Sequence, residues 1–241
     1  MVTIQDNRRP SVDAPKVRIN RALKLCSLFE KVARATFDNA LEVAELDVVR
    51  AGMPIQKQDD NVTSLALLGH GRARLERKLP SGQTVPLGYR GSGDLLGEAA
   101  LAGAQTYTES AIAIDESEVV RFPVASIHAW LRDDPALGVA LLGLLVDRQR
   151  AAEDRIESLL FRNVEGRLVE FLLAAVDRWG VPDTRGTLIS APITHLEIAQ
   201  SIGSTRETVT ITLGALRKDG LLAVAGRRLI VVDRDALAKR R

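Results

Sequence analysis

Residues 194–222 constrain the fold more than any other stretch, because they hold two helix-start signals separated by a glycine. In each signal a hydroxyl residue is followed three residues later by a glutamate, the capping-box pattern. The two pairs are Thr194 with Glu197 and Ser204 with Glu207. Gly203 lies between them, where a tight turn requires positive φ. The spacing predicts two short helices joined by a turn, a helix-turn-helix.

The second predicted helix carries side chains suited to reading DNA. Seven apolar residues are spaced to form the shared core: Leu196, Ile198, Ala199, Ile202, Val209, Leu213 and Leu216. The first turn of the second helix is then exposed, as entry into a major groove requires. Arg206 can donate two hydrogen bonds to guanine O6 and N7, and Glu207 can accept one from cytosine N4. We predict that Arg206, Glu207 and Thr210 read bases and that Thr205 contacts a phosphate.

A hairpin is predicted directly after this element. Residues 221–232, LLAVAGRRLIVV, alternate around a turn at Gly226 and Arg227. A hairpin beside a helix-turn-helix forms a wing, and Arg227 at its tip can reach a phosphate. Upstream, GRLVEFLLAAVDRWG predicts a helix, followed by a polar loop through Pro182 and Gly186. The C-terminal third is therefore predicted to be a winged helix-turn-helix.

A long helix is predicted from Pro135 to about Asn163. Residues spaced alternately by three and four positions form a thin stripe along it, which we call the dimer seam: Leu142, Leu145, Gln149, Ala152, Ile156 and Leu159. This is the heptad spacing of a coiled-coil interface. The alternative is a helix packed on its own β domain, which favours a wider apolar stripe. We predict a parallel homodimer.

The first half of the chain has the pattern of a small β domain. From about Ala44 to Phe122, short apolar or alternating segments are separated by turn residues, including the PSGQ turn at 80–83. These segments predict antiparallel hairpins assembled into a sandwich or barrel. Residues 1–20 are polar and contain two prolines, so we expect a flexible tail before a short helical stretch between Arg21 and Arg34.

Composition and missing motifs exclude several classes of function. The longest uncharged apolar run, 136–146, is about half of the roughly 20 residues that cross a bilayer, and the N-terminus has no signal-peptide pattern. We therefore expect a cytoplasmic protein with no membrane contact. The single cysteine, Cys26, excludes an internal disulfide framework or a four-cysteine metal site. With no nucleophile elbow, phosphate-binding loop or metal-ligand spacing, we expect no catalytic residues, no metal and no cofactor.

Three motifs together resemble one family. They are GDLLGEAAL at 93–101, NVEGRL at 163–168, and IGSTRETVT followed by LRKDGLL in the helix-turn-helix. The chain resembles the cyclic-AMP receptor protein and fumarate–nitrate reduction regulator (CRP/FNR) family of bacterial transcription regulators. The resemblance implies an α+β fold: a cyclic-nucleotide-binding-like β-barrel (jelly roll), a dimerisation helix and a winged helix-turn-helix. The expected domains are 21–133, 134–163 and 164–241, after the tail.

The resemblance also implies a sequence-specific regulator that binds a palindromic DNA site as a homodimer, with RNA polymerase as a further candidate partner. Arg206 and Glu207 match family positions that read a G·C pair. Three residues match phosphate-contacting positions: Thr205, Thr208 and Arg227. The family's second base-reading arginine is replaced by Ile211, which we expect to contact a thymine methyl group instead.

The effector pocket that the resemblance implies departs from the family pattern. Gly97 and Glu98 match a glycine–glutamate pair, but Glu109 and Ser110 stand where an arginine–serine pair neutralises a cyclic phosphate. Ala152 and Glu153 stand where hydroxyl side chains would meet an adenine. We therefore expect a degenerate pocket without cyclic AMP and with an unknown small-molecule effector, if any. Two alternatives remain: another cyclic nucleotide as effector, or an adaptor module whose winged helix contacts proteins.

Overall fold

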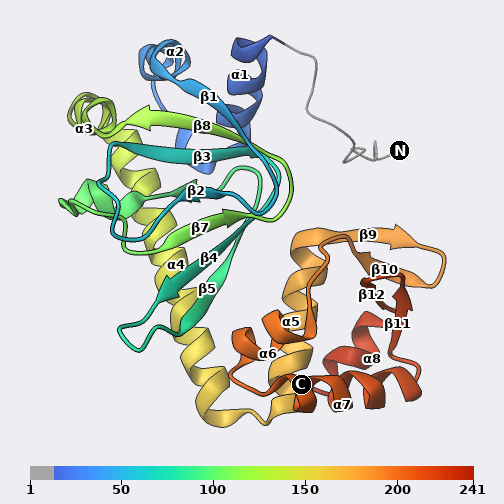
Figure 1. The fold of residues 1–241 in the computed structure, drawn as a ribbon. Helices are drawn as coiled ribbons and strands as arrows, with labels where there is room; N and C mark the ends of the chain where they lie inside the picture. Colours follow the sequence, from blue (N-terminus) through green and yellow to red (C-terminus); the bar gives the residue numbers. More distant parts are fainter. Residues whose placement is uncertain (1–13) are drawn as a thin grey trace. The chain divides into compact units, whose positions relative to one another are not determined.

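The computed structural model describes residues 14–241 and divides into two compact units, with the boundary between Asp147 and Arg148 inside one helix (Figure 1). The first unit combines helices with a β-sandwich, and the second is a helical domain with its own small sheet. The α+β fold class predicted from the sequence is confirmed.

The start of the described chain is helical, which corrects part of the predicted tail. Helix α1 spans Pro15–Leu25 and is followed by a 3₁₀ turn at Ser27–Phe29 and by α2 at Arg34–Val43. Residues 1–13 lie outside the described part of the chain. Residues 15–20 were predicted to be flexible, but Pro15 starts a helix and Ile19 is buried. Apolar residues on one face of α1 therefore join the core of the first unit.

Two four-stranded antiparallel sheets form the sandwich. One sheet has the order β1 (Glu45–Val49), β8 (Ser117–Pro123), β3 (Ser64–His70) and β6 (Leu95–Leu96). The other has the order β2 (Pro54–Gln56), β7 (Ser110–Ala113), β4 (Ala73–Lys78) and β5 (Thr84–Arg90). The predicted 80–83 turn joins β4 and β5, and Gly82 supplies its positive φ of 84°. A short 3₁₀ helix, η2 (Glu98–Ala102), follows β6.

Helices close one side of the sandwich over an aromatic cluster. Phe29, Phe122 and Trp130 have ring centroids 5.7–6.2 Å apart, the range of favourable aromatic contacts. Trp130 belongs to α3 (Val124–Asp133). Asp134 then accepts hydrogen bonds from the backbone of Ala33 and Ala136. These bonds, with one from Thr36, hold the pKa of Asp134 below its usual range.

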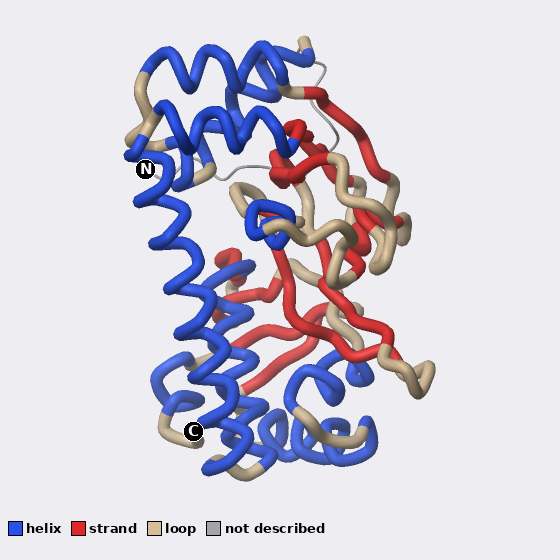
Figure 2. Tube along the Cα trace, turned by 90° about the vertical axis from the view of Figure 1, so that its left-hand side faces the viewer, coloured by secondary structure: helices blue, strands red, loops and turns tan. Residues whose placement is uncertain are grey.

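Helix α4 spans Pro135–Phe161, in agreement with the predicted long helix, and Figure 2 shows it as one continuous helix. Leu137 near its start is fully buried, whereas most of its later apolar side chains are exposed. The exposed members of the dimer seam are Leu142, Leu145, Gln149, Ala152, Ile156 and Leu159. A helix with an exposed apolar stripe has a face suited to a partner.

The second unit continues with three helices around a common core: α5 (Val164–Trp179), α6 (His195–Ile202) and α7 (Arg206–Lys218). Its sheet has the order β11 (Leu222–Ala225), β12 (Arg228–Val231), β10 (Gly186–Ile189) and β9 (Gly180–Asp183). Helix α8 (Arg234–Ala238) follows. The stretch predicted as a polar loop is thus a hairpin, β9–β10. Pro182 is tolerated because β9 is an edge strand.

Candidate nucleic-acid interface

The first capping box is confirmed, and the second is replaced by a simple N-cap one residue later. The Thr194 hydroxyl accepts from the backbone N–H of Glu197, and the Glu197 carboxylate accepts from the Thr194 N–H at 2.8 Å. The second helix is capped by Thr205, whose hydroxyl oxygen accepts from the N–H of Thr208 at 3.2 Å. The predicted pair of Ser204 with Glu207 is therefore wrong. Ser204 lies in the turn, where its N–H donates to a carbonyl of α6.

One arginine holds the turn between the two helices. Gly203 has a φ of 63°, the left-handed conformation that favours glycine. The Arg167 guanidinium on α5 donates to the carbonyl oxygens of Ile202 (2.8 Å) and Gly203 (3.3 Å). It also donates to the carbonyl of Arg162, between α4 and α5, at 2.7 Å. Arg167 thereby satisfies carbonyl groups that the end of a helix leaves without intrahelical partners.

The hydrophobic core shared by α6 and α7 matches the prediction except at one position. Six of the seven predicted core residues are buried: Ile198, Ala199, Ile202, Val209, Leu213 and Leu216. Leu196 is 52% exposed, so its placement in the core was wrong. It is the second residue of α6 and is not among the buried residues of that helix.

The four predicted base-reading residues share one exposed face of α7. Arg206, Glu207, Thr210 and Ile211 are all exposed, and they follow the i, i+1, i+4, i+5 spacing of neighbours on a helix surface. Arg206 and Glu207 occupy the first turn of α7. The free N–H groups at a helix start favour an anion such as a DNA phosphate. The structure therefore brings a guanidinium, a carboxylate and the N-terminal end of a helix together.

Threonine hydroxyls surround the start of α7. Thr205 is exposed and Thr208 is half-buried, with their hydroxyl oxygens 2.9 Å apart. The Thr210 hydroxyl oxygen lies 2.9 Å from Nδ1 of His195, the first residue of α6. The sequence analysis did not assign His195 a role. The sequence signal for its position is that it directly follows Thr194, the capping residue of α6.

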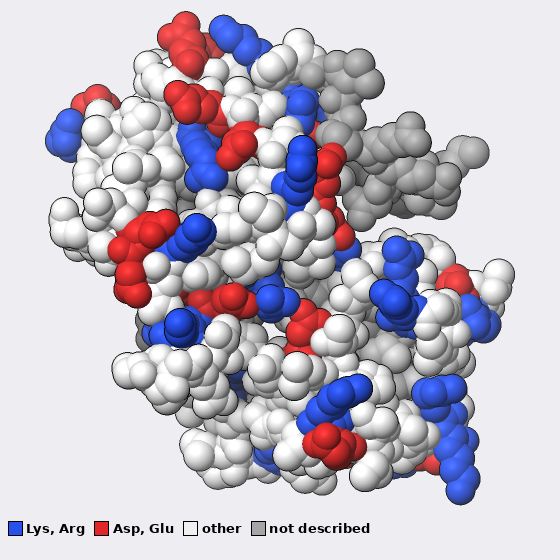
Figure 3. All heavy atoms as spheres, in the orientation of Figure 1, with Lys and Arg blue, Asp and Glu red and all other residues white. Residues whose placement is uncertain are grey.

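The wing, formed by β11 and β12, presents arginines near α7. β11 and β12 are joined at Gly226 and Arg227, as predicted, and Arg227 and Arg228 are exposed. On the face shown in Figure 3, Lys and Arg side chains gather over the sheet of the second unit. A cluster of positive charge of this kind attracts phosphates by counterion release.

In the first unit, protein side chains fill the space beside the predicted effector site. Gly97 has a φ of 81°, and a Cβ atom placed on it would lie 3.0 Å from the ring of Tyr107 and 3.3 Å from Oε1 of Gln56. The Tyr107 hydroxyl donates to the carbonyl of Ser64 at 2.9 Å. The Ser110 hydroxyl accepts from the N–H of Gln58. Glu98 begins η2 next to Gly97.

Two arginines lie near Glu109, and sequence reasoning did not find them. Arg77 on β4 is 3.5 Å from the Glu109 carboxylate and donates to the Thr108 carbonyl at 3.0 Å. The Thr108 hydroxyl also donates to Glu109. Burial lowers the pKa of Arg90 on β5, and the charge of Glu109 opposes this shift. The arginines come from strands distant in sequence, so no local pattern indicates them.

The remaining two predicted pocket residues lie on α4 in the second unit. Ala152 and Glu153 are both exposed, and the Glu153 carboxylate accepts a hydrogen bond from the Gln149 side chain at 2.8 Å. That bond joins neighbours four residues apart on the helix surface. The assignment of Ala152 and Glu153 to an effector pocket stays a prediction.

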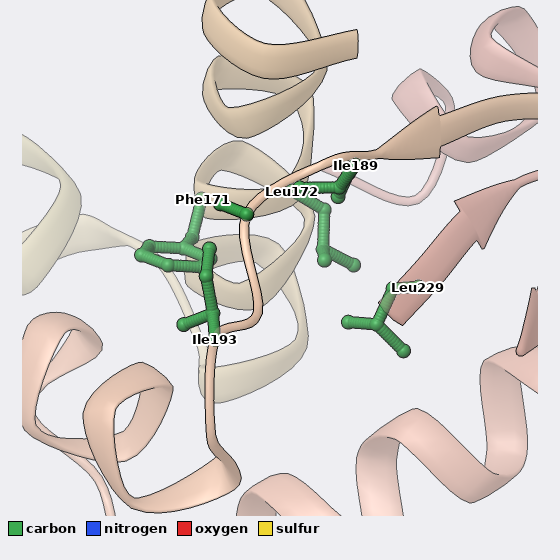
Figure 4. A pocket seen from close by; sticks show the side chains of 6 residues that line it. Phe171, Leu172, Ile189, Ile193 and Leu229 are labelled. Atoms are coloured by element: carbon green, nitrogen blue, oxygen red, sulfur yellow. The ribbon is translucent and has the colours of Figure 1, made fainter. Parts of the chain in front are cut away.

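Residues 14–241 were also considered for metal sites and membrane-spanning helices. Among these residues, no group of three or more His, Cys, Asp or Glu side chains could hold a metal ion, and no helix has both the length and the apolar character to cross a membrane. The recess in Figure 4 lies in the second unit and has only apolar lining residues: Phe171, Leu172, Ile189, Ala191, Ile193 and Leu229. None of these lining residues carries a charge.

The sandwich and the winged helix-turn-helix together define a class, the DNA-binding regulators with a nucleotide-sensor-like domain. Two family patterns match the chain: the cyclic nucleotide-binding domain at residues 46–134 and the Crp-like helix-turn-helix domain at residues 166–240. The cyclic AMP receptor protein of Thermus thermophilus is 31% identical over 83% of this chain and 89% of its own length.

Two further comparisons agree. The fumarate and nitrate reduction regulatory protein of Escherichia coli is 26% identical over 83% of each chain. The crystal structure of a CRP-family transcriptional regulator from Thermus thermophilus matches with a TM-score of 0.68 and 26% identity, over 80% of this chain and 95% of the other. The chain belongs to the CRP/FNR family and is a transcription regulator with a helix-turn-helix DNA-binding domain.

Proposed function

We propose that the chain regulates transcription as a homodimer that binds a two-fold symmetric DNA site without cyclic AMP. Each protomer inserts α7 into a major groove, where Arg206 and Glu207 read a G·C pair and Thr210 and Ile211 contact the next bases. Three residues hold the phosphates: Thr205, Thr208 and Arg227. The observation that carries this proposal is the exposed guanidinium–carboxylate pair on the first turn of α7.

Selection of DNA from random duplexes tests this function. We expect the retained duplexes to share a palindromic consensus whose half-sites are about 10 base pairs apart, one helical turn. Binding should weaken steeply as salt rises, because phosphate contacts release counterions. If the selected duplexes share no consensus, the alternative of a winged helix that contacts proteins gains support.

The homodimer is supported by the dimer seam. Four apolar side chains of the seam are 42–64% exposed: Leu142, Leu145, Ile156 and Leu159. Exposure of this many large apolar groups on one helix is costly unless a partner covers them. A second copy of α4 presents the same spacing, so a parallel pair buries both stripes. Gln149 in the stripe favours one register and two strands.

Two features of the first unit support the proposal that cyclic AMP is not the effector: the negative charge of Glu109 and the side chains packed beside Gly97. A cyclic phosphate placed beside Glu109 would meet a carboxylate, and Arg77 already lies against that carboxylate. Like charges brought close in a desolvated site repel each other strongly. Tyr107 and Gln56 lie against Gly97, where a ligand would approach the backbone. The side chains of Tyr107 and Gln56 therefore occupy the space directly beside Gly97.

Calorimetry with cyclic AMP tests whether the protein binds this nucleotide. We expect no saturable heat at micromolar nucleotide, because a carboxylate stands where the phosphate requires a cation and Arg77 is already paired with it. DNA binding by the same preparation serves as the control that the protein is active. Saturable heat in that range would show that Glu109 does not occupy the phosphate position and would restore a cyclic nucleotide as effector.

A protein that binds chromosomal DNA in a bacterium acts in the cytoplasm, so we place it there. Relatives that regulate transcription support a role in DNA binding and not in catalysis. RNA polymerase is the further partner that an activating role would require.

A further inference from the structure

The hydroxyl group of Thr210 is engaged within the protein. Its oxygen donates to the carbonyl oxygen of Arg206 at 2.8 Å and lies 2.9 Å from Nδ1 of His195. A threonine hydroxyl has one hydrogen. If His195 carries its proton on Nδ1, the hydroxyl hydrogen goes to Arg206; if it does not, Arg206 and His195 are both acceptors for it. In either tautomer the hydrogen stays inside the protein.

This bonding limits what Thr210 can read in a major groove. Guanine O6 and N7, adenine N7 and thymine O4 are acceptors, so each requires a donor. Thr210 is exposed but has no hydroxyl hydrogen left to donate. The part of its side chain without a hydrogen-bonding partner is the γ-methyl group. An apolar contact with the 5-methyl group of thymine is the base contact that such a group favours.

Three exposed residues that follow Thr210 on α7 have no side-chain hydrogen-bond donor. Ile211 is 73% exposed, and Gly214 and Ala215 are exposed one turn later. A Cβ atom on Gly214 would meet nothing within 4 Å, so the surface there is open. The exposed surface of α7 therefore changes from charged in its first turn to apolar at Ile211, Gly214 and Ala215, and becomes charged again at Arg217 and Lys218.

We propose that Thr210 is a specificity-determining residue that reads the 5-methyl group of thymine together with Ile211. His195 is a positioning residue, because its ring holds the Thr210 hydroxyl and so fixes the rotamer that presents the methyl group. This inference rests on the proposed function, since it requires α7 to lie in the major groove. The half-site should then contain a G·C pair followed by at least one thymine under the second turn.

Two variants of Thr210 separate its methyl group from its hydroxyl. Thr210→Val keeps a methyl group and removes the hydroxyl, whereas Thr210→Ser keeps the hydroxyl and removes the methyl. Each is titrated against the selected operator and against operators in which single thymines are replaced by uracil, which lacks the 5-methyl group. For the wild type we expect about a fourfold loss of affinity per contacted methyl group.

The two Thr210 variants should differ in how strongly uracil substitution weakens their binding. Thr210→Val is expected to keep the loss of affinity that uracil causes at this position, because it keeps a methyl group. Thr210→Ser is expected to bind the thymine operator about fourfold more weakly and to lose the uracil effect at one position of each half-site. If Thr210→Val loses affinity while Thr210→Ser keeps the wild-type uracil effect, the hydroxyl reads a base and the inference is overturned.

His195 is tested by the same duplexes. His195→Ala should reduce the uracil effect at the Thr210 position and leave discrimination at the G·C pair unchanged. His195→Asn should restore the uracil effect at the Thr210 position, because an asparagine side-chain amide can form the hydrogen bond that Nδ1 of His195 forms. A merely structural role would lower affinity for all duplexes equally, and that outcome would exclude positioning by His195. Thermal unfolding of each variant checks that the winged helix is intact.

Failure of the proposed function gives a different result. If selection yields no consensus and Arg206→Ala leaves binding unchanged, α7 does not read DNA and both proposals fall. If the G·C readout by Arg206 holds but the two Thr210 variants behave in the reverse order, only the methyl contact is wrong.

Discussion

Replacement of Ile156 by aspartate is expected to separate the dimer and to weaken operator binding about 100-fold or more. Ile156 is 58% exposed at the centre of the second half of the dimer seam. In a parallel pair of α4 helices the two copies of residue 156 face each other. Two carboxylates would then be desolvated without a counter-charge, and an unpaired buried charge costs about 3–5 kcal/mol. Monomers would hold only one half-site each.

Sedimentation equilibrium and gel-shift titration measure the two effects. Ala151→Asp is the matched control, since it adds the same charge to an exposed position of α4 outside the seam. We expect this control to remain dimeric and to bind DNA with near wild-type affinity. If Ile156→Asp stays dimeric at the same concentration, another surface forms the dimer and the seam assignment is wrong.

Replacement of Arg206 by alanine is expected to lower specific affinity by about 1–3 kcal/mol and to relax selectivity at one base position of each half-site. The guanidinium is exposed on the first turn of α7, where two parallel hydrogen bonds to guanine can form. Affinity for random DNA should fall much less, because the phosphate contacts of Thr205 and Arg227 are kept. The loss should therefore appear in the ratio of specific to non-specific binding.

Arg206→Lys is the matched control for charge. A lysine keeps the positive charge but cannot make the planar bidentate contact, so selectivity should fall while the salt dependence stays close to wild type. Gel shifts with operators mutated at single positions measure both quantities. An unchanged footprint with unchanged affinity for Arg206→Ala would contradict the assignment of α7 as the reading helix.

The helix-turn-helix could be predicted closely because its signals are local. Thr194, Glu197 and Gly203 lie within one short stretch, and each has the predicted role. The second helix start was misplaced because two hydroxyl residues, Ser204 and Thr205, are adjacent and either could cap. Thr205 has the extended backbone that a cap requires, with φ −92° and ψ 156°. Sequence alone does not decide between them.

The β9–β10 hairpin was missed for a different reason. Pro182 and Gly186 are typical of loops, and short strands without strong alternation give little signal. The structure accommodates Pro182 on the edge strand of a four-stranded sheet, where a missing N–H is harmless. Pairing with β12, which is distant in sequence, makes this segment a strand.

The surroundings of Glu109 show the limit of prediction for a site. The acidic residue was identified from the resemblance, but its neighbours Arg77 and Arg90 belong to other strands. The register of β4 with β7 and β5 brings these residues together, and a long-range register is not readable from one sequence. The negative charge of Glu109 at the position of the family's arginine could therefore be predicted. The two arginines that lie near Glu109 could not.

The three carbonyl contacts of Arg167 have a mechanical consequence. One rigid guanidinium plane joins the corner after α4 to the corner before α7, through the carbonyls of Arg162, Ile202 and Gly203. These corners are distant along the chain, yet neither can shift without breaking charged hydrogen bonds or dragging the other with it. We therefore expect a displacement of the segment between α4 and α5 to shift the turn before α7 as well.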